Sequence, residues 1–141
     1  MAAEHKPVTR ISISLDQELL DHLDQLVVTR RYANRAEAIR DLIRARLVEL
    51  EWRGNRAVIG TITLLYDHHV RDLPHKLTHM QHDSKARVIS TMHVHLDHNN
   101  CLEVVVVKGR SRDVTELANA LISVRGVRHG ELTATSLGRG L

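Results

Sequence analysis

Phenylalanine is absent from this sequence, and tyrosine and tryptophan together supply only 2% of its residues. A core must therefore be built from leucine, isoleucine, valine and alanine, and the hydrophobic content of 43% is that of a globular chain. One cysteine cannot form a disulfide within the chain, which fits a reducing compartment such as the cytoplasm. No apolar run approaches the length of a membrane span, and residues near the N-terminus lack the apolar core expected of a signal peptide. The 141 residues suit one medium-sized domain or two small ones.

Positive charge is also in short supply, with a formal net charge of only +3. Residues 1–55 hold nine Lys/Arg and nine Asp/Glu, so binding to nucleic acid would have to depend on where single cations stand. Histidine is abundant by contrast. There are eleven, and eight of them lie between His68 and His98. This concentration directs attention to metal chemistry.

An alternation of apolar and polar residues predicts a β-hairpin with strands over residues 88–96 and 101–108. Residues 97–100 between them are turn formers. The apolar members are all even-numbered and comprise Met92, Val94, Leu96, Leu102, Val104 and Val106. The even-numbered face is therefore expected to be the buried one.

A particular register keeps that face together. His95 is expected to pair with Glu103, which leaves residues 98–100 as the loop. A slip by one residue would bury Cys101 and Glu103 with the valines, and the alternation argues against it. Two imidazoles, from His93 and His95, and the thiol of Cys101 are then expected on one face of a rigid sheet.

Imidazole and thiolate are ligands of late first-row divalent metals rather than of magnesium or calcium. His93 and His95 stand two apart on one strand, with Cα atoms about 6.5–7 Å apart, which suits two ligands of one ion. The alternative is a surface strand with two solvated histidines and a partly buried cysteine. Because the only cysteine of the chain falls on the histidine face, the metal site is favoured.

A strand followed by two helices is predicted in the N-terminal part. Residues 8–15 alternate strictly, and Asp16 is a helix-start residue for an amphipathic helix to about Thr29. Asn34 starts a second helix that continues to about Trp52. These elements bury too little core alone, and the strand has no local partner. Both deficits disappear if two copies intertwine and pair strand with strand.

This N-terminal part resembles the ribbon-helix-helix repressors, on residues 10–16 and 34–41. The resemblance implies that an antiparallel ribbon enters the major groove of DNA. Arg10, Ser12 and Ser14 would then read base edges; the alternative is a merely solvated strand face. Residues 1–7 are expected to form a flexible arm.

A change of period follows residues 51–55, which are expected to be a linker. The order strand, helix, two hairpin strands, helix, strand predicts the ferredoxin-like βαββαβ motif, with the non-hairpin elements at residues 57–66, 72–81, 113–124 and 127–136. The expected fold class is therefore α+β. We expect a DNA-binding domain over residues 1–53 and a second domain over residues 54–141.

A ribbon-helix-helix domain followed by such a domain resembles the nickel-responsive repressor family NikR, over about residues 8–135. The motifs that carry the resemblance include Asn34 to Asp41, Tyr66-Asp-His, Arg71-Asp72-Leu73, Gln81-His82, His93-Val-His95-x5-Cys101-Leu-Glu103 and Gly126-Val127-Arg128-His129-Gly130. In that family an ACT-like C-terminal domain assembles a tetramer. Each nickel ion lies between two subunits in a near-planar site of three nitrogens and one sulfur.

Carried onto this sequence, the resemblance implies that His93, His95 and Cys101 come from one subunit and His82 from its neighbour, with one Ni²⁺ per subunit. A near-planar site favours nickel(II) or copper(II), whereas zinc prefers a tetrahedron. Glu103 is expected beside the ligands, opposite His95 in the register above.

Several further residues have two interpretations. Glu37 and Asp41, four apart on the second helix, resemble the carboxylates of a second cation site in the family, or are helix-surface acids. His68, His69, His75 and His79 either form a second, weaker metal site or are solvated histidines of a helix and a loop.

The sequence thus predicts a cytoplasmic, nickel-responsive transcriptional repressor that is not an enzyme. It would be a homotetramer, a dimer of dimers, that binds an inverted-repeat operator in double-stranded DNA, with no membrane partner.

One alternative is an ACT-type DNA-binding regulator that senses a small molecule, although histidine and cysteine stand where a ligand-binding glycine loop would be wanted. An antitoxin-like DNA binder leaves the four ligands unexplained. A metallo-hydrolase would need an open coordination position and a base.

Overall fold

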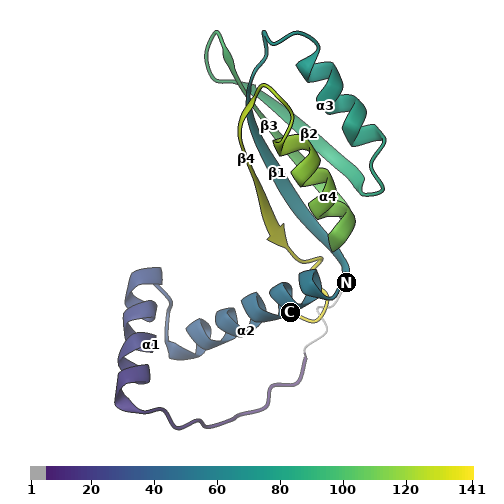
Figure 1. Ribbon diagram of the computed structural model, residues 1–141. Coiled ribbons are helices and arrows are strands. Elements are labelled where there is room, and N and C mark those ends of the chain that lie inside the picture. The colour runs from purple at the N-terminus through teal and green to yellow at the C-terminus, as the bar shows by residue number, and fades with distance from the viewer. Residues whose placement is uncertain (1–5) are drawn as a thin grey trace. The chain divides into compact units, whose positions relative to one another are not determined.

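The computed structural model describes residues 6–141, which form two compact units, one up to Leu42 and one from Ile43 (Figure 1). The predicted N-terminal arm lies mainly in residues 1–5, outside the described residues. Across the described part of the chain, no helix combines the length and the apolar character needed to span a membrane.

Helix α1 (Gln17–Arg30) begins where the sequence predicts it. The side chain of Asp16 accepts a hydrogen bond from the backbone N–H of Leu19 at 2.9 Å, which satisfies one of the free donors of the first turn. The helix ends at Arg31, whose backbone is left-handed with φ 57° and whose N–H closes onto the last turn.

Helix α2 (Arg35–Arg53) also starts as predicted, since the side-chain oxygen of Asn34 accepts from the backbone N–H of Glu37 at 2.9 Å. The Glu37 carboxylate pairs with Arg40. The helix ends at Arg53, close to the predicted end at about Trp52, so residues 51–53 of the predicted linker are helical. Its C-terminal turn therefore belongs to regular structure and not to a loose connection.

Residues 6–16 form no strand in the single chain, although the sequence predicts one over residues 8–15. A lone strand leaves a row of backbone donors and acceptors unpaired, and the expected partner is the same segment of a second copy. Ile11 and Ile13, which would share one face of such a strand, are 76% and 57% exposed. Their apolar surface is thus left uncovered by one chain alone.

The second unit is a four-stranded antiparallel sheet with two helices. Its elements are β1 (Ala57–Asp67), α3 (Leu73–His82), β2 (Arg87–His95), β3 (Asn100–Arg110), α4 (Ser111–Ile122) and β4 (Val127–Thr135). The strands lie in the order β2-β3-β1-β4, and every neighbouring pair is antiparallel. The predicted βαββαβ motif and the α+β class are confirmed.

Both helices cover one face of this sheet (Figure 1). The core between them is aliphatic, as the lack of phenylalanine requires, and includes Ile62 of β1, Leu77 of α3 and Leu121 of α4, all fully buried. Burial of each such side chain stabilises the folded state by about 1.5–3 kcal/mol. Gly130 lets β4 approach α4, because a Cβ there would lie 2.5 Å from Cγ1 of Ile122.

The predicted register of the β2–β3 hairpin is wrong by two residues. His95 pairs with Cys101, and His93 pairs with Glu103, whereas the sequence pattern paired His95 with Glu103. The reason is that the turn is centred one residue earlier in the chain than expected. Asp97 accepts the backbone N–H groups of Asn99 and Asn100, each at 2.8 Å, and these bonds close the chain just beyond His95.

The predicted buried face of the hairpin is also wrong. Cys101, Glu103, Val105 and Val107 lie under the helices, and Cys101 and Glu103 are 2% and 1% exposed. Residues 104–107 are four consecutive valines, so β3 has two apolar faces and alternation alone cannot select one. The even-numbered face is the open one, and Met92 and Leu96 are 56% and 53% exposed there.

Candidate metal centre

The three predicted ligands of one chain come from neighbouring strands. His93 and His95 are on β2, Cys101 is on β3, and the observed register places all three side chains on the helix side of the sheet. Directly opposed residues of antiparallel strands have Cβ atoms about 4.5–5.5 Å apart, so His95 and Cys101 are within reach of one ion. The thiol is buried, whereas both imidazoles are exposed at the edge of the sheet.

The β2 strand turns its histidines to this side because it is irregular. Its pairing with β3 shifts between Val88 and Ser90, where one extra residue is inserted. Val88 before the shift and Thr91, His93 and His95 after it therefore point to the same side of the sheet. The bulge re-aims the strand so that the odd-numbered histidines join the odd-numbered cysteine.

Glu103 is a buried carboxylate directly beside this group. Its two oxygens accept hydrogen bonds from the phenol of Tyr66 at 3.1 Å and from the amide of Gln81 at 2.9 Å. Nε2 of His93 lies 3.8 Å from the same carboxylate, so Glu103 neighbours His93 and not His95 as predicted. A ring nitrogen facing a carboxylate favours one tautomer and orientation of the imidazole.

Tyr66 was not assigned a role from the sequence. Burial, followed by the nearby Glu103 carboxylate, raises the pKa of its phenol well above the usual range, so Tyr66 is a neutral donor. It lies on β1 directly opposite Cys101. In the sequence, Tyr66 falls at an even-numbered position in phase with the apolar residues Ile62 and Leu64 of β1, which indicates a buried side chain.

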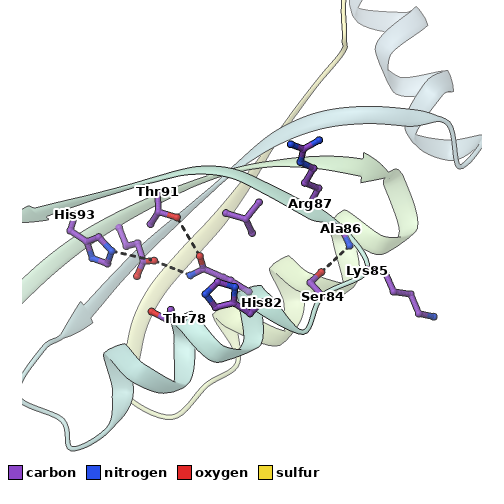
Figure 2. A pocket seen from close by; sticks show the side chains of 11 residues that line it. Thr78, His82, Ser84, Lys85, Ala86, Arg87, Thr91 and His93 are labelled. Atoms are coloured by element: carbon purple, nitrogen blue, oxygen red, sulfur yellow. Dashed lines mark hydrogen bonds and ion pairs between the residues drawn. The ribbon is translucent and has the colours of Figure 1, made fainter.

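His82 lies at the exposed C-terminal end of α3, directly after the buried Gln81. It lines an open pocket of about 500 Å³ together with His93 and Glu103 (Figure 2). Gln81 of α3 links the helix to the sheet strands that line the pocket. Its amide oxygen accepts a hydrogen bond from the hydroxyl of Thr91 on β2 at 3.4 Å, and its amide nitrogen donates one to Glu103 on β3. Within residues 6–141, no three His, Cys, Asp or Glu side chains of the single chain converge closely enough to hold a metal.

The other histidines between His68 and His98 divide into two groups. The centroid of the His68 ring lies 4.2 Å from that of His69 and 5.5 Å from that of His95. The centroids of the His69 and His98 rings are 5.0 Å apart. A ring nitrogen of His69 contacts the backbone oxygen of His98 at 2.8 Å, so the turn after β2 is held against the segment after β1.

His75 and His79 lie on exposed positions of α3, and His79 pairs with Asp83 at 3.2 Å. The structure therefore gathers His68 and His69 around His95 and His98, a grouping that sequence spacing did not predict.

The predicted DNA readers Arg10, Ser12 and Ser14 are exposed in the extended N-terminal segment. Their readout role stays a prediction, because the ribbon requires a second chain. The predicted second cation site has its carboxylates engaged locally: Asp41 accepts from the phenol of Tyr32, and Glu37 pairs with Arg40. That site, too, stays a prediction.

Two family models match the chain. One, described as the NikR C terminal nickel binding domain, matches residues 59–135, and the other, described as a ribbon-helix-helix protein of the copG family, matches residues 9–50. A ribbon-helix-helix unit followed by a nickel-binding domain defines a metal-responsive regulator and not an enzyme.

Close relatives cover almost the whole chain. A nickel-responsive regulator from Geobacter sp. (strain M21) is 55% identical over 133 residues, which are 94% of this chain and 96% of that protein. One from Solibacter usitatus (strain Ellin6076) is 55% identical over 132 residues, 93% of this chain and 95% of that protein. The chain belongs to the NikR family of nickel-responsive regulators.

Among solved structures, the ACT domain of a GTP pyrophosphokinase from Chlorobium tepidum is 13% identical with a TM-score of 0.47. The superposition covers 54% of this chain and 97% of the ACT domain, and the likeness is too distant to bear on function.

Proposed function

We propose that this protein represses transcription in the cytoplasm when Ni²⁺ occupies a site made by His93, His95 and Cys101 of one subunit and His82 of a neighbour. The observation that carries this proposal is the β2–β3 register, which sets His95 opposite Cys101 and His93 on the same side. One ion per subunit follows if every chain supplies each ligand once, and the resemblance to the NikR family implies a homotetramer.

The donor set fits nickel(II). Imidazole nitrogen and thiolate sulfur are ligands of late first-row metals, and a planar arrangement of four such donors is typical of nickel(II) and copper(II). His93, His95 and Cys101 of β2 and β3 and His82 of a neighbouring α3 would hold the ion, which would supply a divalent charge between them. The burial of Cys101 beside Tyr66 and Glu103 gives the sulfur a fixed position, while the exposed histidines complete the set.

Sharing between subunits is supported by where His82 lies. It stands on the exposed end of a helix, and within residues 6–141 no three possible ligands of one chain, with or without His82, converge closely enough to hold a metal. An exposed imidazole at a helix end is free to meet the sheet edge of another copy. A shared ion then makes metal occupancy depend on how the subunits are arranged.

Uncovered apolar surface supports assembly in both units. In the first, a groove of about 290 Å³ is lined almost entirely by apolar side chains, namely Ile13, Leu15, Leu19, Leu23, Leu26, Ile39 and Leu42, with His22. In the second, the open face of the sheet carries exposed Ile89, Met92 and Leu96. Such surfaces are expected to be buried against further copies. Intertwined N-terminal segments would form the ribbon, and the sheets would join two such dimers.

In this assembly Arg10, Ser12 and Ser14 would face the major groove, and two ribbons would meet two half-sites of an inverted repeat. Metal occupancy would favour the arrangement in which both ribbons reach DNA together. Because linkage is reciprocal, operator DNA would tighten nickel binding by the same factor.

Complementation between variants tests the shared site. Cys101→Ala and His82→Ala tetramers should each lose tight nickel binding, measured by an absorption titration that follows the thiolate-to-nickel band. Mixed tetramers of the two variants should regain part of it, because some sites then combine an intact Cys101 with an intact His82. His79→Ala, one turn earlier on α3, is the matched control and should keep one ion per chain. Absence of recovery in verified mixed tetramers would count against sharing.

Operator binding tests the regulatory role. Affinity for an inverted repeat should rise on adding one equivalent of nickel at fixed salt, since phosphate contacts make affinity steeply salt-dependent. A half-turn insert between the half-sites should abolish the gain, because the two ribbons would then face opposite sides of the duplex. Affinity that ignores both nickel and the insert would leave a DNA-binding metalloprotein without a switch.

A further inference from the structure

Trp52, the only tryptophan of the chain, lies in the last turn of α2, and its indole N–H and its backbone oxygen both form hydrogen bonds to the second unit. Its indole N–H donates to the backbone oxygen of Thr135 at the end of β4, at 2.9 Å. Its own backbone oxygen accepts from the hydroxyl of Ser111 at 2.5 Å, at the start of α4. A residue that the sequence assigned to a linker thus joins three elements of the second unit.

The indole ring also packs on the sheet, where β1 has no side chain. A Cβ at Gly60 would lie 3.3 Å from the Cη2 atom of Trp52 and 3.1 Å from the backbone oxygen of Thr133. Glycine therefore leaves the space that the ring covers. Trp52 is one of the partly buried side chains that pack against the core of the sheet.

The chain that follows Trp52 is held in the same place. Asn55 takes a left-handed backbone conformation with φ 53°, and its side-chain oxygen accepts from the backbone N–H of Arg112 at 3.1 Å. The backbone oxygen of Asn55 accepts from the Arg110 guanidinium at 3.3 Å, and that of Arg56 accepts from the N–H of Ser111 at 3.0 Å. The connection between α2 and β1 is therefore a hydrogen-bonded junction and not a free hinge.

This junction and the proposed metal ligands lie towards opposite ends of the same two strands, because Gly60 pairs with Val107 whereas Cys101 pairs with Tyr66. Gly60, under the indole ring, is on β1, and β1 pairs along its whole length with β3, which carries Cys101 and Glu103. At its other end the same α2 begins at Arg35, within the unit that ends at Leu42. One continuous helix thus belongs to both units and is fastened to the sheet at its C-terminal end.

We propose that Trp52 is a positioning residue that fixes the end of α2 to the metal-binding sheet, so that nickel occupancy acts on the DNA-binding unit through this helix. The inference rests on the proposed function. It predicts that loosening Trp52 separates the two activities: nickel still binds and DNA still binds, but one no longer changes the other. A residue needed only for folding would reduce both together.

The test compares operator affinity with and without one equivalent of nickel in the full-length protein. Trp52→Leu removes both the N–H donor and the ring, and Trp52→Phe restores an aromatic ring without the donor. Ser111→Ala releases the other hydrogen bond while leaving the indole in place. Arg53→Ala is the matched control, because this exposed neighbour on the same turn pairs only with Glu49 among the interactions of the described residues.

Trp52→Leu should keep nickel binding at the wild-type stoichiometry and reduce the nickel-induced gain in operator affinity at least about tenfold, within the usual range of allosteric coupling. Trp52→Phe should recover part of the gain, Ser111→Ala should lose part, and Arg53→Ala should lose none. A gain unchanged within about twofold in both Trp52→Leu and Ser111→Ala would overturn the inference. If the unmodified protein shows no gain at all, the proposed function itself fails, which is a distinct result.

Emission from Trp52 gives a second readout that needs no substitution. If the junction stays closed in the operator-bound form, collisional quenching by acrylamide should be equally weak with and without nickel and operator. Ser111→Ala should increase the quenching. If acrylamide quenches Trp52 emission much more strongly in the nickel-loaded, operator-bound protein than in the free protein, the junction opens in that state. That result would overturn the inference even if the variants lost coupling.

Discussion

Arg128 and Asn100, which are 28 positions apart in the sequence, are joined by a hydrogen bond of 2.6 Å from the guanidinium to the side-chain oxygen. Arg128 is on β4 and Asn100 is the first residue of β3, immediately before Cys101. The same guanidinium lies 3.4 Å from the Asp67 carboxylate at the end of β1. Three strand ends are therefore tied together beside the proposed sulfur ligand.

Removing this tie should weaken nickel binding without unfolding the domain. In Arg128→Gln we expect nickel affinity to fall between about twofold and tenfold, because one exposed, charge-assisted contact contributes roughly 0.5–1.5 kcal/mol. Competition titration against a chelator measures this. Arg125→Gln, an exposed arginine just before β4, is the control and should bind nickel like the unmodified protein. Equal losses in both variants would point to overall charge rather than to the tie.

The turn that closes the ligand hairpin should respond to acid. The side-chain amide of Asn100, followed by the backbone N–H groups of Asn100 and Asn99, holds the pKa of Asp97 below its ordinary value of 3.8. Because the folded-state pKa is the lower one, ionised Asp97 stabilises the fold at pH above about 3.8, and this contribution is lost as the pH falls through the folded-state pKa.

An NMR titration of the side-chain carboxyl carbon of Asp97 would measure that pKa directly. Asn100→Ala should raise it toward 3.8 without restoring it fully, since the backbone donors remain. An Asp97 that titrates at or above its ordinary value in the unmodified protein would refute the assigned turn.

Glu103 should matter to stability as well as to the metal. Glu103→Ala leaves the Tyr66 phenol and the Gln81 amide without their acceptor in a buried place, and we expect it to cost about 2–4 kcal/mol of unfolding free energy. Tyr66→Phe removes one donor and keeps the ring, so its cost should be nearer 1 kcal/mol. Urea denaturation of the metal-free protein gives both values. A cost for Glu103→Ala no larger than that for Tyr66→Phe would mean that the carboxylate is not needed as an acceptor.

Arg10 should carry sequence discrimination on DNA. Arg10→Ala is expected to cost about 1–3 kcal/mol of preference for operator over unrelated DNA, through loss of a bidentate contact to a guanine. Ser12→Ala and Ser14→Ala should cost less, because each can lose only a single hydrogen bond. The measurement is operator affinity against random DNA at one salt concentration. Equal weakening on both DNAs would assign Arg10 to the phosphate backbone.

Element order and helix starts were predictable because local chemistry sets them. Asp16 and Asn34 accept from backbone N–H groups in the first turns of α1 and α2, as N-cap residues do in most helices. The strand order of the βαββαβ unit follows from its motif. The ribbon strand over residues 8–15 was predicted from its pattern, but a single chain offers it no partner.

The hairpin face and register were not predictable from alternation. Val104 to Val107 are apolar at every position, so both faces satisfy the pattern, and the bulge near Ile89 changes which side the β2 residues take. A register error of two residues leaves every side chain on its own face, so hydrophobic burial cannot detect it. Side-chain contacts of the turn, above all those of Asp97, decide it.

The hydrogen bond from Trp52 to Thr135 has a consequence for the order in which the protein is made. The acceptor belongs to β4, and β1 lies between β3 and β4 in the sheet, so neither flank of β1 is available when β1 leaves the ribosome. Such pairings across long sequence separations form slowly compared with helices. On a growing chain, the N-terminal helices have time to fold first, and in the proposed dimer they would meet a second nascent copy before the sheet is complete. Pairs of chains would then be chosen during synthesis, before the domain that senses the metal is complete.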